Sequence, residues 1–196
     1  MRGLLVVFEG LDQSGKQTQA ELLRDRLKQE GHKSRLVSFP DYGTSIGEEI
    51  ARALQGERDY AADTMQLLYV ANRFEWKPEI ARELAGGTVV VCDRYLASSV
   101  AYGEAFGLDA AWLAEIQRYL PQPELTVLLD IDPQVSASRK TAERDKYERD
   151  LSLLSRVRES YLRQASSSPR WLRLDAGRDR DEVAGDVYTA VSPLLA

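Results

Sequence analysis

Five short apolar runs divide the chain, and longer amphipathic segments lie between them. The apolar runs are rich in Val, Leu and Ile and scarcely alternate with polar residues, which is typical of strands buried on both faces of a sheet. They predict strands over 4–8, 35–39, 88–92, 125–131 and 171–174. The amphipathic segments predict helices over 16–30, 44–55, 61–85, 109–119, 133–141, 151–165 and 179–194.

Glycine and proline support this division, because Gly31, Gly56 and the pair Gly86 and Gly87 follow predicted helices and Pro133 begins one. Regular alternation of strands and helices predicts an α/β fold with three layers, in which helices cover both faces of a five-stranded, mostly parallel sheet. The chain has 196 residues and no internal repeat or linker. We therefore expect a single domain over 1–196.

Composition narrows the classes of protein that fit. A net charge of −5 argues against binding to a nucleic-acid polymer. The single cysteine, Cys92, allows no disulfide within the chain and fits a reducing compartment. The apolar run before Glu9 is too short for a signal peptide or a membrane span. We expect a cytoplasmic protein without membrane contact.

A phosphate-binding motif follows the first predicted strand and opens the first predicted helix. Gly10, four residues, Gly15 and Lys16 have the spacing of a loop whose backbone N–H groups wrap a phosphate, while the lysine reaches the outer phosphates. The motif normally places Ser or Thr directly after the lysine to contact Mg²⁺, and here that residue is Gln17, with Thr18 one position later. The motif predicts a nucleoside triphosphate and leaves the metal site open.

Further candidate residues lie at strand ends and on one long helix. Asp93 and Arg94 directly follow the third strand, where a carboxylate suits Mg²⁺ and its waters and a guanidinium suits a second phosphate. Tyr69 and Arg73 are four residues apart and share a helix face that fits a base, or else a simple surface pair. The charged segment 139–149 fits either a solvated connection or a cationic lid over transferring phosphates.

Together these residues resemble the thymidylate kinases, which transfer the γ-phosphoryl group of ATP to dTMP. The resemblance covers nearly the whole chain and rests on the phosphate loop, Phe39-Pro40, Ala71-Asn72-Arg73, Asp93-Arg94-Tyr95 with Ser98, and Tyr147. It implies a P-loop kinase fold with a lid at about 139–150, ATP and Mg²⁺ as cofactors, and a homodimer. Several apolar positions fit either a dimer interface or the core, namely Met65, Leu68, Leu113, Ile116 and Tyr119.

The resemblance also implies a role for each matching position. ATP contacts Gly10, Leu11, Asp12, Gln13, Ser14, Gly15, Lys16, Gln17 and Thr18, and its adenine packs on Arg139. The dTMP contacts are Asp12, Phe39, Tyr42, Tyr69, Arg73, Arg94, Ser98, Ser99, Tyr102 and Tyr147. The groups that assist the transfer are Lys16, Asp12, Arg94 and Asp93, with a lid cation from among Arg144, Lys146 and Arg149. The metal contacts are Asp93 and Gln17, directly or through water.

Two positions depart from patterns of this family. Some members carry an arginine where this chain has Gln13, and members without it supply the cation from the lid, which is why one of the three lid cations is expected to act. Gln17 leaves a second question open: its amide oxygen contacts Mg²⁺ or one of its waters, or the chain binds nucleotide without catalysis. A kinase for another deoxynucleotide or deoxynucleoside is the remaining alternative.

Overall fold

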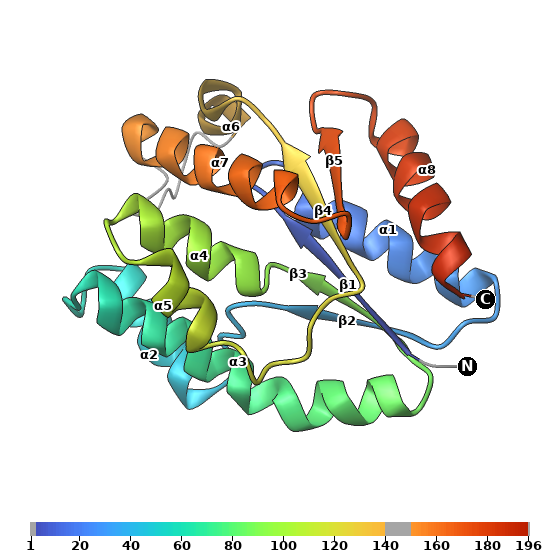
Figure 1. Cartoon of the computed structure of the whole chain (residues 1–196), viewed down its shortest axis with the longest axis horizontal. Helices are drawn as coiled ribbons and strands as arrows, with labels where there is room; N and C mark the ends of the chain where they lie inside the picture. The colour runs from blue at the N-terminus through green and yellow to red at the C-terminus, as the bar shows by residue number, and fades with distance from the viewer. Residues whose placement is uncertain (1–2, 140–149, 196) are drawn as a thin grey trace.

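The computed structural model describes residues 3–139 and 150–195 and contains one five-stranded sheet (Figure 1). The strands are β1 (Leu4–Glu9), β2 (Ser34–Ser38), β3 (Val89–Asp93), β4 (Leu125–Asp130) and β5 (Trp171–Asp175). They pair in parallel in the order β2-β3-β1-β4-β5, so the predicted five-stranded parallel sheet is confirmed. Their nearly continuous apolar sequences reflect burial on both faces, since all six residues of both β1 and β4 are buried.

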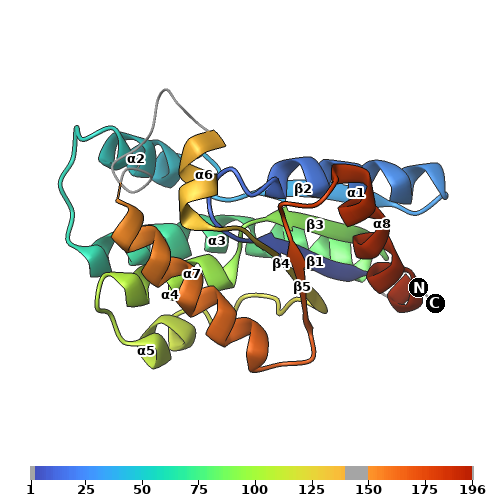
Figure 2. The ribbon, with the colours of Figure 1, turned by 90° about the horizontal axis from the view of Figure 1, so that it is seen from above.

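Helices cover both faces of this sheet and complete the three layers (Figure 2). They are α1 (Lys16–Gln29), α2 (Ser45–Leu54), α3 (Ala62–Ala85), α4 (Leu96–Ala105), α5 (Ala110–Glu115), α6 (Pro133–Arg139), α7 (Leu151–Ser166), α8 (Arg180–Val191) and a 3₁₀ turn (Ser192–Leu195). Residues of α1 and α8 form one apolar core with alternate residues of β1, β3 and β4. The opposite face packs against α3, α4 and α7 in two further clusters. Cys92 on β3 is fully buried in one of these two clusters.

Among the elements that the structure describes, helix α4 is the one that the sequence pattern does not predict. Its sequence is poor in large apolar residues, so no amphipathic stripe marks it, and Ser98, Ser99 and Gly103 are weak helix formers. Its small residues allow close packing instead: a Cβ added to Gly103 would lie 2.5 Å from the Cδ1 atom of Leu113. The helix expected over 109–119 is shorter than predicted, because α5 ends at Glu115 and turns follow.

The register of the sheet brings polar residues together at one edge. Phe8 and Ser38 both pair with Asp93, and Glu9 pairs with Leu128, so β1, β2 and β3 end side by side. The carboxyl ends of parallel strands are where ligands bind in open α/β sheets. The two chain termini lie together at the opposite end of the molecule (Figures 1 and 2).

Candidate active site

The loop between β1 and α1 has the backbone geometry that the glycine spacing predicts. Gly10 has φ +142° and Gly15 has φ +89°, and Gln13 also adopts a left-handed conformation with φ +59°. A Cβ added to Gly10 would lie 2.5 Å from the carbonyl oxygen of Leu129, so only glycine fits against β4 there. A Cβ at Gly15 would have no heavy atom within 4 Å, which leaves open space before the N-terminus of α1. This arrangement suits a bound phosphate.

Lys16 also lies where the phosphate-binding motif places it. Only 6% of its surface is exposed, and its Nζ donates a 2.7 Å hydrogen bond to the carbonyl of Leu11. Burial and the nearby Arg94 guanidinium lower the pKa of Lys16 to about 8, against the opposing effect of Asp12 and other carboxylates. A buried ammonium with this pKa gains strongly from an anionic ligand.

The two candidate metal contacts differ in their surroundings. Asp93 ends β3, and its buried Oδ1 atom has no hydrogen-bond partner within the described residues. Burial raises the pKa of this carboxyl group, with Lys16 and Arg94 opposing the effect. Gln17 is exposed on α1 and its amide nitrogen donates a 3.0 Å bond to Glu21. The described residues include no group of three or more His, Cys, Asp or Glu side chains arranged for a metal.

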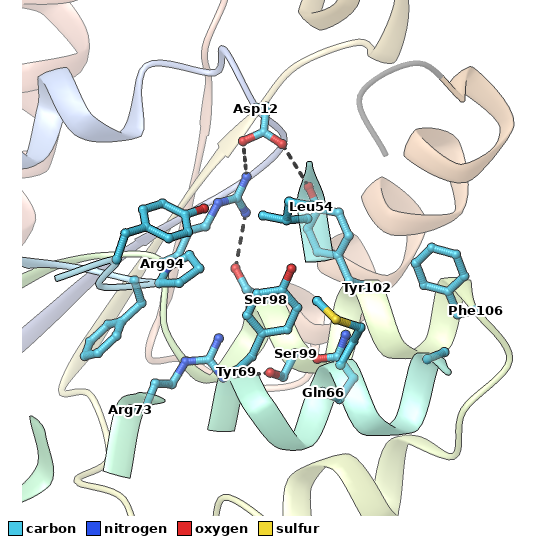
Figure 3. A pocket seen from close by; sticks show the side chains of 15 residues that line it. Asp12, Leu54, Gln66, Tyr69, Arg73, Arg94, Ser98, Ser99, Tyr102 and Phe106 are labelled. Atoms are coloured by element: carbon cyan, nitrogen blue, oxygen red, sulfur yellow. Dashed lines mark hydrogen bonds and ion pairs between the residues drawn. The ribbon is translucent and has the colours of Figure 1, made fainter. Parts of the chain in front are cut away.

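Arg94 connects the phosphate loop with the end of β3. Its backbone is left-handed, with φ +64°, and its amide donates a 2.9 Å bond to the carbonyl of Phe8. Its Nη2 atom lies 2.6 Å from Oδ1 of Asp12, whose Oδ2 accepts a 3.2 Å bond from the Tyr102 hydroxyl (Figure 3). Burial alone would raise the pKa of Asp12, but Arg94 and Lys16 hold it well below its usual range. Asp12 is therefore an anion beside two cations.

A pocket opens directly beside this ion pair (Figure 3). Nine of the ten residues expected to contact dTMP line it, namely Asp12, Phe39, Tyr42, Tyr69, Arg73, Arg94, Ser98, Ser99 and Tyr102. The tenth, Tyr147, lies outside the described residues, as do Arg144, Lys146 and Arg149. The family resemblance therefore named most of this lining, which comes from the phosphate loop, the ends of β2 and β3, one face of α3 and helix α4.

Arg73 contributes a second cation to the pocket, deep on α3. It is only 3% exposed, and its Nη1 atom donates to Ser99 Oγ at 2.6 Å and to Gln117 Oε1 at 3.0 Å. Burial lowers its pKa below the usual arginine value. Its Nε atom is buried without a partner in the described structure, so it retains a donor for a ligand.

The remaining pocket residues were not predicted, and they are Pro40, Leu54, Ala62, Met65, Gln66 and Phe106. The spacing on α3 carries a signal for two of them, because Met65 and Gln66 lie one turn before Tyr69 and share its face. Leu54 and Phe106 come from the ends of α2 and α4, and their approach to the pocket depends on how these helices pack. Such packing is not encoded in local spacing.

Asn72, which belongs to the Ala71-Asn72-Arg73 motif, has a structural role that the sequence does not indicate. It is fully buried on α3, and its amide accepts a 2.8 Å bond from the Asp41 backbone N–H and donates to Thr44 Oγ1 at 2.9 Å. Trp76 Nε1 donates to Asp41 Oδ2 at 2.7 Å. These bonds attach the loop after β2, which carries Phe39 and Tyr42, to α3.

Arg139 ends α6 close to the phosphate loop. Its Nη1 atom donates to the Gln13 carbonyl at 3.1 Å and its Nη2 atom to the Ala176 carbonyl at 3.2 Å. This guanidinium therefore bridges the phosphate loop and the turn after β5, on the donor side of the site.

In the described part of the chain, no helix combines the length and apolar character needed to cross a membrane.

Comparisons with known proteins match this chain to thymidylate kinases. A family model described as thymidylate kinase matches residues 8–187. A thymidylate kinase from Clavibacter michiganensis is 38% identical, and the match covers 100% of this chain and 98% of that protein. The Schizosaccharomyces pombe enzyme is 33% identical over 97% of this chain and 92% of its own length. A solved thymidylate kinase from Candida albicans, described as having broad substrate specificity, superposes with a TM-score of 0.87 at 28% identity and covers 98% of this chain and 92% of its own.

Proposed function

Because the chain belongs to the thymidylate kinase family, we propose that it transfers the γ-phosphoryl group of ATP to dTMP and releases ADP and dTDP. The observation that carries this proposal is the position of Asp12, which belongs to the phosphate loop and also lines the adjoining pocket. A triphosphate on the loop and a monophosphate in the pocket would therefore meet at Arg94. No general base is needed, because the acceptor phosphate is already an anion.

On the donor side, the ATP phosphates bind to the backbone of the loop from Gly10 to Thr18 and to Lys16. The support is the open space before Gly15 and the buried ammonium of Lys16. Arg139, which bonds to the Gln13 carbonyl, packs on the adenine. Mg²⁺, when bound, neutralises charge on the transferring phosphates. Asp93, whose buried Oδ1 atom has no hydrogen-bond partner within the described residues, would hold it or its waters. The amide oxygen of Gln17, whose amide nitrogen bonds to Glu21, would supply a second contact.

On the acceptor side, the thymine ring stacks on Tyr69 and its edge bonds to the guanidinium of Arg73, which lines the pocket. Arg94 binds the monophosphate, while Asp12 and Tyr102 face the sugar. The side chains of Phe39, Tyr42, Ser98 and Ser99 complete the walls. Positioning and charge stabilisation by these groups account for the reaction, with a lid cation completing the charge balance.

A coupled assay of ADP release tests the proposal. ADP release should depend on added dTMP and on Mg²⁺, and dTMP should exceed dUMP, dCMP and dGMP in kcat/KM. Preference for another of these acceptors would indicate the alternative of a kinase for a different deoxynucleotide. ATP binding without acceptor-dependent ADP release would indicate a nucleotide-binding protein that lacks transfer.

We also propose a homodimer in a cytoplasmic setting. Met65 and Leu113 are buried within the monomer and are not available for an interface. Leu67 on α3 and Tyr119 after α5 are 47% and 63% exposed, and an interface that covers Leu67 would remove this apolar side chain from water. Analytical ultracentrifugation of the wild type and of a Leu67→Glu variant tests this, because a dimer through this surface would dissociate in the variant.

A further inference from the structure

A buried carboxylate, Glu9, lies behind the phosphate-binding arginine at the end of β1. Its exposed fraction is 0%, and four donors surround it. Oε1 accepts from the backbone N–H groups of Tyr95 at 2.9 Å and Ser98 at 3.2 Å. Oε2 accepts from the hydroxyls of Ser98 at 2.6 Å and Tyr161 at 3.1 Å. Burial of a charged group is tolerated when hydrogen bonds replace its water in this way.

The bonds to Oε1 fix the backbone that carries Arg94. Helix α4 begins at Leu96, and none of its own side chains caps it, so Glu9 supplies the acceptor for its first N–H groups from the neighbouring strand. Arg94 immediately precedes this capped turn and has a left-handed backbone that is unfavourable for a residue with a side chain. The capping contacts therefore stabilise an otherwise costly conformation.

The two hydroxyls that bond to Oε2 also contact the side chain of Arg94. Its Nη1 atom donates to Ser98 Oγ at 3.2 Å and to the Tyr161 hydroxyl at 3.2 Å. A hydroxyl has a single proton, so when it donates that proton to Glu9 its lone pairs remain for Arg94. Glu9 thus orients two neutral hydroxyls toward one side of the guanidinium. The other side, through Nη2, faces Asp12 and the pocket (Figure 3).

We propose that Glu9 and Tyr161 are positioning residues for the acceptor phosphate, acting through Arg94. The two hydroxyls are neutral, so they hold Nη1 without adding to the negative charge that Asp12 places beside Nη2. An arginine held in this way loses less side-chain freedom on binding than a mobile one. Tyr161 belongs to α7, the helix that follows residues 140–149, so the position of α7 affects Arg94 as well. This inference rests on the proposed function, since it concerns the same monophosphate.

Tyr161 also packs in an apolar cluster, so its test must separate packing from phosphate binding. Tyr161→Phe keeps the ring and removes the hydroxyl. Thymidine and dTMP differ only by the phosphate, and calorimetry on the full chain measures the affinity of both. We expect the Kd for dTMP to rise about tenfold, as the loss of one hydrogen bond to a charged group implies, while the Kd for thymidine stays within about twofold.

Tyr188→Phe is the matched control, because Tyr188 lies on α8 and its hydroxyl bonds to the exposed Glu30 far from the pocket. It should change neither affinity. Glu9→Gln provides a second variant, and we expect it to lose more affinity for dTMP than for thymidine. The measurement is made under conditions in which circular dichroism confirms that the variant is folded. Equal losses of affinity for both ligands, or no loss of affinity for dTMP in Tyr161→Phe, would overturn the inference. Turnover of dTMP by the wild type would still support the proposed function in that case. A wild type that binds neither ligand would overturn both.

Discussion

The buried ammonium of Lys16 predicts that the phosphate-binding loop lowers the stability of the free protein. Its pKa falls from the ordinary value of 10.5 to about 8 in the folded chain. This difference corresponds to about 3 kcal/mol of unfavourable free energy when the group is charged at pH 7. Lys16→Met removes the charge at similar volume and loses the hydrogen bond from the ammonium to the Leu11 carbonyl, a cost of about 1.5 kcal/mol.

The Leu11 carbonyl still accepts a bond from the Ser14 backbone N–H at 3.3 Å, so it does not become an unpaired buried group. We therefore expect Lys16→Met to raise the free energy of unfolding at pH 7 by about 1.5 kcal/mol while ATP binding is lost. Urea unfolding followed by circular dichroism measures this difference. Lys28→Met, on the exposed last turn of the same helix, is the control and should change stability by less than about 0.5 kcal/mol.

The dependence on pH gives the sharper test. Between pH 8 and pH 10.5 the folded chain has released the Lys16 proton and the unfolded chain retains it, so wild-type stability rises with pH relative to the variant. By pH 9.5 the unfavourable free energy has fallen to about 1 kcal/mol, and the advantage of the methionine variant should disappear. A variant less stable than the wild type at pH 7, or a difference that stays constant up to pH 9.5, would refute the reasoning.

The other predictions concern the metal, the lid, proton uptake and packing. Gln17→Thr should retain or raise kcat in the coupled assay; an inactive wild type that this change restores would favour binding without catalysis. Alanine substitution of each lid cation should show one variant with kcat lowered by at least ~10²-fold, whereas equal, small losses would exclude such a role for Arg144, Lys146 and Arg149. ATP binding at pH 8.5 should take up protons, because the triphosphate raises the Lys16 pKa; calorimetry in buffers of different ionisation enthalpy measures this, and no uptake would contradict the assigned pKa. Gly103→Ala should lower stability by about 1–3 kcal/mol because of the contact with Leu113, while Gly185→Ala, in open space on α8, should raise it by about 0.5–1 kcal/mol; similar thermal shifts in both would contradict the packing argument.

Local patterns in the sequence predicted the parallel sheet, whereas most of the pocket lining was predicted by the family resemblance. Continuous apolar runs mark strands buried on both faces, and residues at strand ends such as Asp93 and Arg94 necessarily meet at one edge of a parallel sheet. Tyr69 and Arg73 were placed on one face by helical spacing alone. Their functional roles came from family resemblance, and the individual assignments stay predictions until they are tested.

What the sequence did not predict depends on contacts between distant segments. Helix α4 has no amphipathic pattern and starts with a cap from Glu9, a residue 89 positions before Ser98. Tyr161 reads as one aromatic residue of an amphipathic helix, and its bond to Arg94 exists only because α7 packs on α4. Asn72 likewise gains its role through a loop 31 residues earlier.

The hydrogen bonds of Asn72 have a consequence for how a nucleotide enters the pocket. They join the loop after β2 to α3. Gly47 at the start of α2 packs closely on the same loop, since a Cβ there would lie 1.8 Å from the Asp41 carbonyl oxygen. The wall that carries Phe39 and the wall that carries Arg73 are thus parts of one rigid body. We therefore expect these two walls to move together when a nucleotide enters the pocket, and the bond from Arg73 to Ser99 attaches α4 to them as well.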